Sequence, residues 1–304
     1  ILIDARKGVL EQTVRHSYIA TLLDIRHIVF CINKMDMENY SEKVYLNIKK
    51  DLCALADKLK IENVNYIPIS AKFGDNVVKS SEKMNWYEGK TFLQFIETVE
   101  IKKIKNSSEC RFPVQTVIRP FSEKFHDYRG YAGRLAGGIL RIGDPVTVLP
   151  SMLKSRISGI DQLGKSLTEA SAGDSISIIL EDQIDLNRGN LIVRSDELPE
   201  SGQDIKLMIC WFNEKPMKIG SKYLIQMNTN EVECVIKAIN YRMNIDTLEQ
   251  DFESTFINMN DIANITIKTS KPVFFDEYRK NNITGSMIFI DEGTNETVAA
   301  GMIV

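Results

Sequence analysis

The sequence lacks the features of disulfide-rich, zinc-binding and membrane-spanning proteins. Its five cysteines form no Cys-x-x-Cys pair and there are only three histidines, which gives no sign of a disulfide framework or a structural zinc site. No apolar run approaches the roughly 20 residues that a membrane-spanning helix needs. We therefore expect a reduced, cytoplasmic protein with no membrane partner and no metal site of its own.

The sequence also lacks an excess of positive charge. Lysine and arginine total 38 against 41 aspartate and glutamate residues, and the net charge is −3. A broad nucleic-acid footprint usually carries a clear positive surplus, so no nucleic-acid partner is expected, although a local basic patch is compatible with this balance. A chain of 304 residues is long enough to bury two or three cores.

The most informative segment that is present is Asn33-Lys34-Met35-Asp36, which follows an apolar run from Ile28 to Ile32. An Asn-Lys-x-Asp motif after a buried strand is typical of guanine recognition, because one carboxylate can accept from both the N1–H and N2–H₂ donors of the base. Adenine lacks that donor pair and would leave a buried Asp36 unpaired. Asn33 is expected to bond the purine edge and the stem of Lys34 to lie along the ring face. The alternative is a plain surface turn.

A second segment supports the same site. The stretch from Asn63 to Ile69 is typical of another buried strand, and Ser70-Ala71-Lys72 follows it directly. Ser-Ala-Lys alone is often only a strand exit, but here it stands one strand–helix unit after the first motif. Ligands of parallel sheets bind at the carboxyl ends of the strands. We therefore predict that Ser70, Ala71 and Lys72 complete the guanine pocket, with backbone N–H groups on the guanine carbonyl oxygen.

The residues that would handle phosphate are missing. No phosphate-binding loop and no Asp-x-x-Gly segment precede Asn33, and the sequence opens without methionine inside the apolar segment Ile1–Ala5. We expect a longer parent chain, truncated here at its N-terminus, in which the ligands of Mg²⁺ and the GTP phosphates lie upstream of residue 1. Residues 1–304 would then hold no catalytic residue, be inactive alone, and include a labile nucleotide domain with exposed sheet edges.

One segment imitates a phosphate loop. Gly159 to Ser166 fits the pattern G-x-x-x-x-G-K-[ST], which has meaning only between a strand and a helix. Here it follows an alternating stretch, Arg156 to Ile160, and precedes another strand-like segment, Ser175 to Leu180. We predict a hairpin tip.

Residues 1 to about 105 alternate between strand and helix patterns, which favours a parallel sheet covered by helices. Helices are expected at Glu11–Leu23, after the N-cap Ser41, and at Thr91–Glu97. A polar run from Lys102 to Glu109 is the predicted linker.

Beyond the linker the helical periodicity disappears and short alternating strands with Gly and Asp turns follow, as in antiparallel barrels. A weak boundary is expected at Leu198–Gly202. The fold class is thus a partial α/β nucleotide domain followed by two antiparallel β-barrels. The predicted domains are 1–108, 109–199 and 200–304. The predicted barrel strands are Phe112–Ile118, Tyr131–Ala136, Pro145–Leu149, Arg156–Ile160, Ser175–Leu180, Asp204–Phe212, Tyr223–Met227, Val232–Tyr241, Ile262–Thr269, Met287–Ile290 and Val298–Val304.

This layout resembles the translation-factor type of GTPase, and nearly the whole chain is similar to one branch of it, the GTPase subunit of bacterial heterodimeric sulfate adenylyltransferase. The segments that carry the resemblance are Leu2–Arg6 with Gln12, Thr13 and His16, then Asn33–Asp36, Trp86–Gly89, Arg111–Gln115, Arg129–Gly133, Gly143–Asp144, Val148–Ser151, Thr284–Asp291 and Thr297–Ile303. Met152 stands where relatives often have Gly, which affects only a turn.

The resemblance implies a two-subunit enzyme that forms adenylyl sulfate and pyrophosphate from ATP and sulfate. In that family a small catalytic subunit transfers the adenylyl group, and GTP hydrolysis on the large subunit drives the reaction. This chain would belong to the large subunit, with GTP and Mg²⁺ as cofactors. Because the two barrels carry no chemical motif of their own, we further expect them to form part of the subunit interface.

Two other functions remain open. A translation elongation-factor-like GTPase that binds tRNA or the ribosome would have the same domains, although the net charge of −3 and the family-specific barrel segments disfavour it. An interaction module with a vestigial nucleotide site is the third hypothesis, and the presence or absence of a phosphate-binding loop would decide it.

Overall fold

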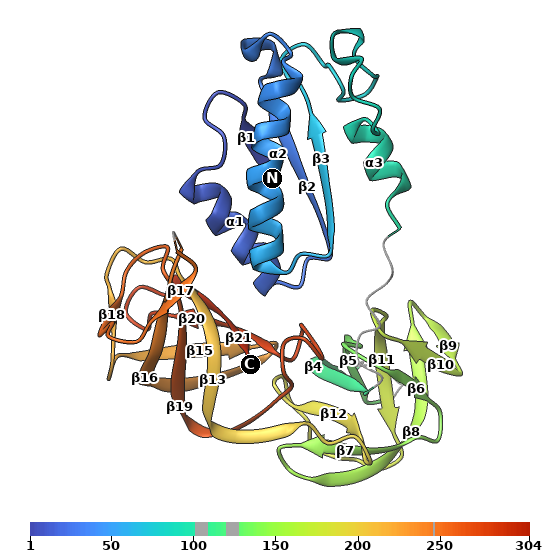
Figure 1. Cartoon of the computed structure of the whole chain (residues 1–304). Coiled ribbons are helices and arrows are strands. Elements are labelled where there is room, and N and C mark those ends of the chain that lie inside the picture. Colours follow the sequence, from blue (N-terminus) through green and yellow to red (C-terminus); the bar gives the residue numbers. More distant parts are fainter. Residues whose placement is uncertain (101–108, 120–127, 246) are drawn as a thin grey trace. The chain divides into compact units, whose positions relative to one another are not determined.

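The computed structural model describes residues 1–100, 109–119, 128–245 and 247–304. These residues form two compact units (Figure 1). The first holds the described residues of Ile1–Lys102 and Asn244–Glu249, and the second those of Lys103–Met243 and Gln250–Val304. The predicted linker lies outside the described residues, apart from Glu109.

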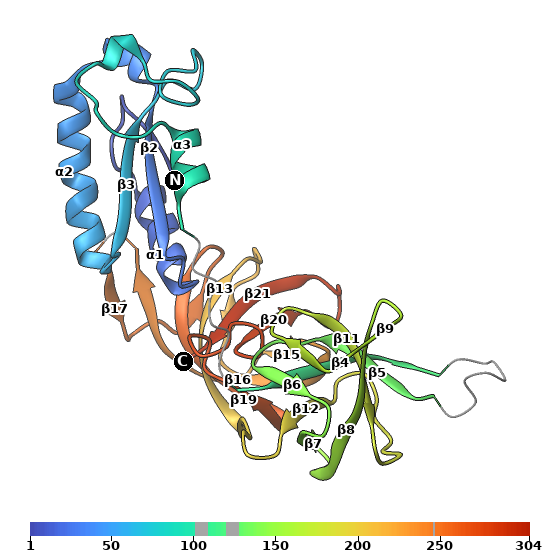
Figure 2. The ribbon, with the colours of Figure 1, turned by 90° about the vertical axis from the view of Figure 1, so that its right-hand side faces the viewer.

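The first unit is built on a parallel sheet with the strand order β1-β2-β3. Its elements are β1 (Leu2–Asp4), α1 (Glu11–Leu22), β2 (His27–Asn33), the 3₁₀ helix η1 (Met35–Glu38), α2 (Glu42–Leu59), β3 (Asn63–Pro68), the 3₁₀ helix η2 (Glu82–Met84) and α3 (Phe92–Thr98). Helices α2 and α3 lie on opposite sides of the sheet (Figure 2). This confirms the predicted parallel α/β unit.

Alternation along β2 explains the two layers. Phe30 and Ile32 belong to the core cluster that includes the buried face of α2, whereas Cys31 belongs to the cluster that α3 covers. Cys31 is thus a core residue, and burial raises the pKa of its thiol. All five cysteines are free.

Local signals in the sequence define the helix ends. The Ser41 side chain accepts from the Val44 N–H and caps α2, and Thr91 caps α3 in the same way through Gln94. The apolar face of α2 is buried at Tyr45, Ile48, Leu52 and Leu55. Trp86 and Tyr87 pack around Tyr45, so this pair has a packing role in the first unit.

The second unit contains two antiparallel barrels. In the first, β11-β5-β4-β12-β7-β8 close into a ring through the pairing of β11 with β8. The strands are β4 (Arg111–Ile118), β5 (Gly130–Arg134), β6 (Ile139–Arg141), β7 (Pro145–Leu149), β8 (Leu153–Gln162), β9 (Lys165–Leu167), β10 (Glu169–Ser171), β11 (Ser175–Leu180) and β12 (Leu191–Arg194). Gly133 is required here, since a Cβ at that position would meet the Pro113 carbonyl oxygen at 2.4 Å.

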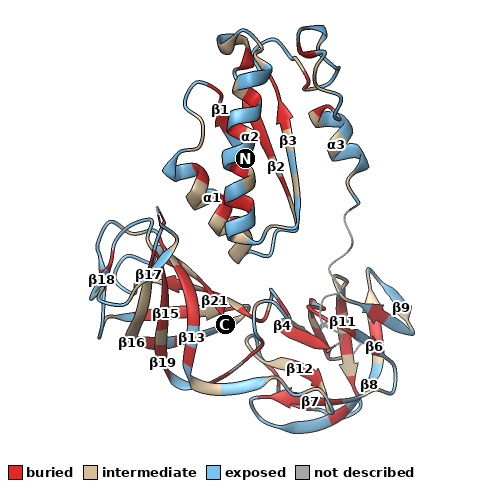
Figure 3. Ribbon diagram, in the orientation of Figure 1, coloured by how far each residue is buried: buried red, intermediate tan, exposed pale blue. Residues whose placement is uncertain are grey.

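The strands of the second barrel follow the order β15-β20-β21-β13-β19-β16. The first and last of them, β15 and β16, also pair with each other and close the ring. Its strands, with those at its margin, are β13 (Glu200–Trp211), β14 (Met217–Lys218), β15 (Lys222–Met227), β16 (Asn230–Asn244), β17 (Glu249–Asp251), β18 (Phe256–Ile257), β19 (Ile262–Phe275), β20 (Ser286–Ile290) and β21 (Thr297–Ile303). Buried residues follow the strands of both barrels (Figure 3). The predicted pair of barrels is confirmed.

The segment that imitates a phosphate loop is a hairpin tip, as predicted. Strand β8 turns at Leu163 and Gly164 into β9, and Asp161 pairs with Ser166 across the turn. Both turn residues have positive φ, 49° and 78°, which is the geometry of a tight two-residue hairpin. No helix follows, so the segment cannot cradle phosphate.

Strand β13 begins within Leu198–Gly202, the segment where a boundary is expected. Glu200, Ser201 and Gly202 already belong to β13 and pair with Phe275, Phe274 and Val273 of β19. Turn-type residues enter a strand here because a neighbouring strand supplies the hydrogen-bonding partners.

A buried ion pair joins the two barrels. The Arg111 guanidinium in β4 donates two hydrogen bonds, of 2.9 and 2.8 Å, to the carboxylate of Asp276, which follows β19. The two side chains are 1% and 5% exposed. Arg111 also donates to the carbonyl oxygens of Cys110 and Glu197, and Thr284 donates its hydroxyl to Asp276. The charges are therefore satisfied on both sides, which is what makes their burial tolerable.

We predict that Arg111→Ala lowers the free energy of unfolding by about 3–5 kcal/mol, because it leaves the buried Asp276 carboxylate without its counter-ion. The measurement is equilibrium urea unfolding. Arg141→Ala is the matched control, since it breaks an ion pair with Glu169 whose side chains are 54% and 56% exposed, and it should cost under about 1 kcal/mol. Equal losses for the two variants would contradict the importance of the buried pair.

Candidate guanine-nucleotide site

Two loops meet at the carboxyl edge of the parallel sheet. Strands β2 and β3 pair in register, ending with Ile32 opposite Pro68. Beyond the strands, the Ile69 N–H donates to the Ile32 carbonyl oxygen at 2.8 Å and the Met35 N–H donates to the Ile69 carbonyl oxygen at 3.2 Å. The loop after β2, residues 33–40, and the loop after β3, residues 69–76, therefore lie side by side. These are the two predicted motif segments.

Asn33 ties the two loops together. Its side-chain oxygen accepts from the Lys34 N–H at 2.7 Å and from the Ala71 N–H at 3.0 Å. Lys34 has a φ of +67°, a left-handed conformation that is unfavourable for a non-glycine residue unless surrounding bonds fix it. The side chain of Asn33 supplies one of those bonds.

Asp36 is held by Ser70. The Ser70 hydroxyl donates to Oδ1 of Asp36 at 2.6 Å, and Ser70 itself is fully buried. A hydroxyl–carboxylate bond of this length is of the short, charge-assisted kind. An ionised carboxylate offers about four lone-pair sites on its two oxygens, so Asp36 retains capacity for two further donors. The carboxylate thus has a fixed orientation and remains able to accept from a ligand.

Two of the predicted site residues have other roles in the structure. The Met35 side chain is fully buried in the core of the first unit, so it contributes to the loop through its backbone. Lys72 is exposed and its Nζ lies 5.1 Å from the ring centre of Phe73. The backbone N–H groups of Ser70 and Ala71 donate to the Asp75 carbonyl oxygen and to Asn33.

The sequence motifs did not reveal a charged cluster beside Lys34. Its Nζ donates to Oδ2 of Asp4 at 2.8 Å, and Arg6 donates to both oxygens of the same carboxylate. The Arg6 guanidinium, followed by the Lys34 ammonium, holds the pKa of Asp4 well below its usual range. Asp4 ends β1, which neighbours β2, so the rule that ligand-binding residues follow the carboxyl ends of parallel strands could have found it.

A second pair that the motifs did not reveal links the far ends of the two loops. The Tyr40 hydroxyl donates to Oδ2 of Asp75 at 3.0 Å. Ser81 donates to the other oxygen of Asp75 at 2.7 Å.

Within the described ranges of the chain, no group of three or more His, Cys, Asp or Glu side chains could hold a metal ion. Among the same residues, no helix combines the length and the apolar composition needed to cross a membrane.

Two family models match the sequence. Residues 1–118 match the Elongation factor Tu GTP binding domain, and residues 204–304 match the GTP-eEF1A C-terminal domain-like family. The structure resembles a crystal structure of Sup35 complexed with GDP with a TM-score of 0.60, over 99% of this chain and 76% of that one, at 20% sequence identity. At that identity the likeness concerns the fold.

Two curated relatives are similar over the full length of this chain. Sulfate adenylyltransferase subunit 1 of Buchnera aphidicola subsp. Acyrthosiphon pisum (strain Tuc7) is 42% identical, and the protein of the same name from Cellvibrio japonicus (strain Ueda107) is 43% identical. The chain spans 63% of the length of each relative. The resemblance inferred from the motifs is confirmed: over its full length the chain is similar to proteins named sulfate adenylyltransferase subunit 1, and its first 118 residues match the Elongation factor Tu GTP binding domain.

Proposed function

We propose that the two loops at the edge of the parallel sheet form the guanine pocket of a GTPase. The observation that carries this proposal is the orientation of Asp36 by the buried Ser70 hydroxyl. A carboxylate fixed in this way can accept from the N1–H and N2–H₂ groups of guanine without first losing conformational freedom.

The other predicted residues have subsidiary roles in this proposal. The stem of Lys34 covers one face of the purine ring while its ammonium stays on Asp4. Asn33 bonds the purine edge with the amide group that also steadies the loops. The guanine carbonyl oxygen takes a backbone N–H at Ala71, in competition with Asn33. Met35 and Lys72 support the pocket from the core and from the surface.

We further propose that the whole protein is the regulatory GTPase subunit of a sulfate adenylyltransferase. The full-length similarity to two proteins named sulfate adenylyltransferase subunit 1 supports this. The reaction joins the α-phosphate of ATP to sulfate and releases pyrophosphate, and the mixed anhydride formed is high in energy. GTP hydrolysis would supply the driving force, and a small catalytic subunit would transfer the adenylyl group.

The proposal includes a magnesium ion bound with GTP. The described residues near Asp36 offer no cluster of metal ligands, so the ion and the phosphates would be held by other parts of the protein. Five free cysteines support a reducing compartment, the cytoplasm.

Three domains complete the proposal. Residues 1–108 are the C-terminal part of the GTP-binding domain, 109–199 the first barrel and 200–304 the second. The start of β13 at Glu200 and the family match over residues 204–304 support the second boundary.

The second candidate is a translation-factor-like GTPase that binds tRNA or the ribosome. The descriptions of the two family models favour it. The names of the relatives that are more than 40% identical and the net charge of −3 favour sulfate activation instead.

We predict that Asp36→Asn, introduced into the longest natural form of the protein that contains this chain, weakens GTP binding by at least about 100-fold. In the variant, the NH₂ group of asparagine replaces one carboxylate oxygen, so a donor faces one of the N–H donors of guanine and that hydrogen bond is lost. Xanthine carries a carbonyl at C2, which pairs with that amide, so the variant should prefer xanthosine triphosphate. Both affinities are measured by competition with a fluorescent nucleotide.

Glu38→Gln is the matched control, because it makes the same chemical change on the same 3₁₀ helix, η1. It should leave the affinity for GTP within about twofold of the wild-type value. If Asp36→Asn behaved like this control, Asp36 would not be the guanine-reading residue.

For the whole enzyme, co-expressed with its small subunit, we predict that GTP strongly stimulates sulfate-dependent formation of adenylyl sulfate from ATP. Asp36→Asn should abolish stimulation by GTP and restore it with xanthosine triphosphate. Chromatographic quantification of adenylyl sulfate is the measurement. GTP binding without sulfate chemistry, together with salt-dependent tRNA binding, would instead identify a translation-type factor.

A further inference from the structure

Tyr40 ends the loop after β2 in a conformation that needs external support. Asn39 and Tyr40 have φ values of 50° and 56°, both in the left-handed region that disfavours residues with a Cβ. Two consecutive residues of this kind persist only where their surroundings over-determine the backbone.

Hydrogen bonds fix Tyr40 at each of its polar groups. Its N–H donates to the Met35 carbonyl oxygen at 2.8 Å, and its carbonyl oxygen accepts from the Trp86 indole at 3.0 Å. Its hydroxyl donates to the carboxylate of Asp75 at 3.0 Å. The first of these bonds closes the turn around Asp36, and the third reaches the other loop.

Hydrogen bonds also fix Asp75, on the loop after β3, through both its backbone and its side chain. Its carbonyl oxygen accepts from the Ser70 N–H at 3.1 Å, and its carboxylate accepts from the Ser81 hydroxyl at 2.7 Å. The side chain is 13% exposed. A mostly buried carboxylate with two hydroxyl donors is a rigid acceptor for Tyr40.

These bonds form a closed ring. Asp36 accepts from the Ser70 hydroxyl, the Ser70 N–H reaches the Asp75 carbonyl oxygen, and the Asp75 carboxylate accepts from Tyr40. Tyr40 returns to Met35, which precedes Asp36 in the chain. The two loops are therefore connected at the base-reading end by Ser70 and at the far end by Tyr40 and Asp75.

We propose that the Tyr40–Asp75 hydrogen bond is a brace that holds the two guanine loops at the spacing a purine requires. Tyr40 and Asp75 are then positioning residues, which act on the base through Asp36 and Ser70. This inference rests on the proposed guanine site. A pocket whose loops are already fixed loses less conformational entropy on binding, so the brace increases affinity without contacting the base.

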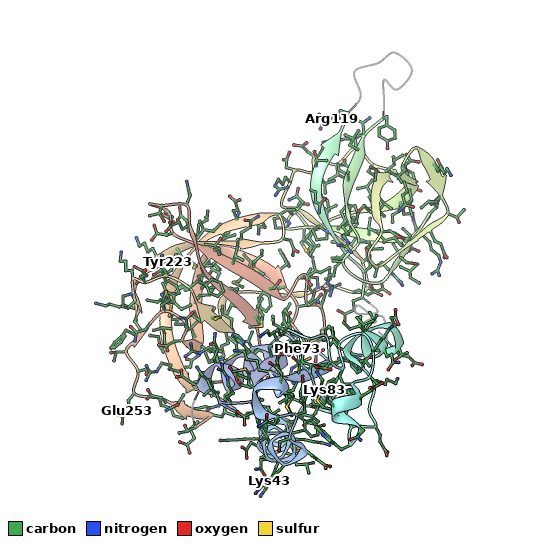
Figure 4. All side chains as sticks on the ribbon, turned by 90° about the horizontal axis from the view of Figure 1, so that it is seen from above. Lys43, Phe73, Lys83, Arg119, Tyr223 and Glu253 are labelled. Atoms are coloured by element: carbon green, nitrogen blue, oxygen red, sulfur yellow. The ribbon has the colours of Figure 1, made fainter. Side chains whose placement is uncertain are left out.

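Lys83 reinforces the brace. Its Nζ donates to the Tyr40 hydroxyl oxygen at 3.1 Å and lies 3.9 Å from the Asp75 carboxylate. Because the ammonium can only donate, it leaves the Tyr40 hydroxyl to donate to Asp75. The hydrogen bond that Lys83 donates to Tyr40 raises the pKa of the Lys83 ammonium group. The Lys83 Nζ also lies 5.3 Å from the ring centre of Phe73, which is on the same loop as Asp75. Lys83 and Phe73 are neighbours in Figure 4.

The test is Tyr40→Phe in the longest natural form of the protein, which removes one hydroxyl and keeps the ring. Dissociation of fluorescent GDP, followed by chase with unlabelled GDP, should become about tenfold faster, since a bond to a charged acceptor is lost. The preference for guanine over xanthine and adenine should be unchanged, because Asp36 still reads the base. Asp36→Asn, in contrast, should change that preference.

Tyr45→Phe is the matched control. The Tyr45 hydroxyl donates to the Tyr66 carbonyl oxygen at 3.2 Å in the same unit, and this bond joins α2 to β3 instead of joining the two loops. The control loses a comparable bond, so its melting temperature should fall by a similar amount while GDP dissociation stays within about twofold of the wild-type rate. Equal dissociation rates for the two variants would overturn the proposal.

A measurement without nucleotide separates the brace from the guanine site. Hydrogen–deuterium exchange of peptides that cover residues 69–76 should be about tenfold faster in Tyr40→Phe than in the wild type or in Tyr45→Phe. Unchanged exchange there would overturn the brace. A different result is possible, in which the wild-type protein fails to bind GDP but exchange is still faster in Tyr40→Phe. The proposed guanine function would then be wrong, and the hydrogen bond between the two loops would be confirmed.

Discussion

Parallel pairing of β2 with β3 places the carboxyl ends of both strands at one edge of the sheet, and every feature of the candidate site depends on that alignment. In a parallel pair both chains leave the sheet in the same direction, so loops that are distant in sequence become neighbours. A slip of one residue would turn Phe30 and Ile32 away from their core cluster. The hydrophobic pattern of β2 therefore sets the register that brings Asp36 to Ser70.

Short polar side chains then convert this alignment into a defined pocket. Asn33 and Ser70 each bond across the gap between the loops, and neither has many rotamers to lose. A carboxylate near a sheet edge is costly to desolvate unless it has partners, and the Ser70 hydroxyl lowers that cost for Asp36. The same hydrogen bond restricts the Asp36 carboxylate to one orientation. The stability of the loops and the proposed recognition of guanine therefore both depend on the bond between Ser70 and Asp36.

Local features of the fold and the meeting of the two motif loops were predictable from the sequence, but individual side-chain bonds outside the motifs were not. The motif at Asn33–Asp36, the cap at Ser41 and the hairpin at Leu163 each depend on neighbouring residues, and the structure has them where the pattern indicates. Tyr40 and Asp75 are 35 residues apart, and nothing in either local segment indicates the bond. Glu200–Gly202 are in a strand despite their turn-type composition, because they pair with β19, which lies far along the chain.

Different interactions hold the barrels and the candidate site in place. Each barrel closes on itself, so the strands of both rings find partners on either side. The Arg111–Asp276 pair then fixes one barrel to the other through charges that are costly to separate once buried. In the parallel sheet, side-chain hydrogen bonds such as that from the Ala71 N–H to Asn33 hold together the loops that follow β2 and β3. It follows that rigidity at the candidate site depends on side-chain bonds such as Asn33–Ala71, whereas rigidity in the barrels depends on backbone pairing.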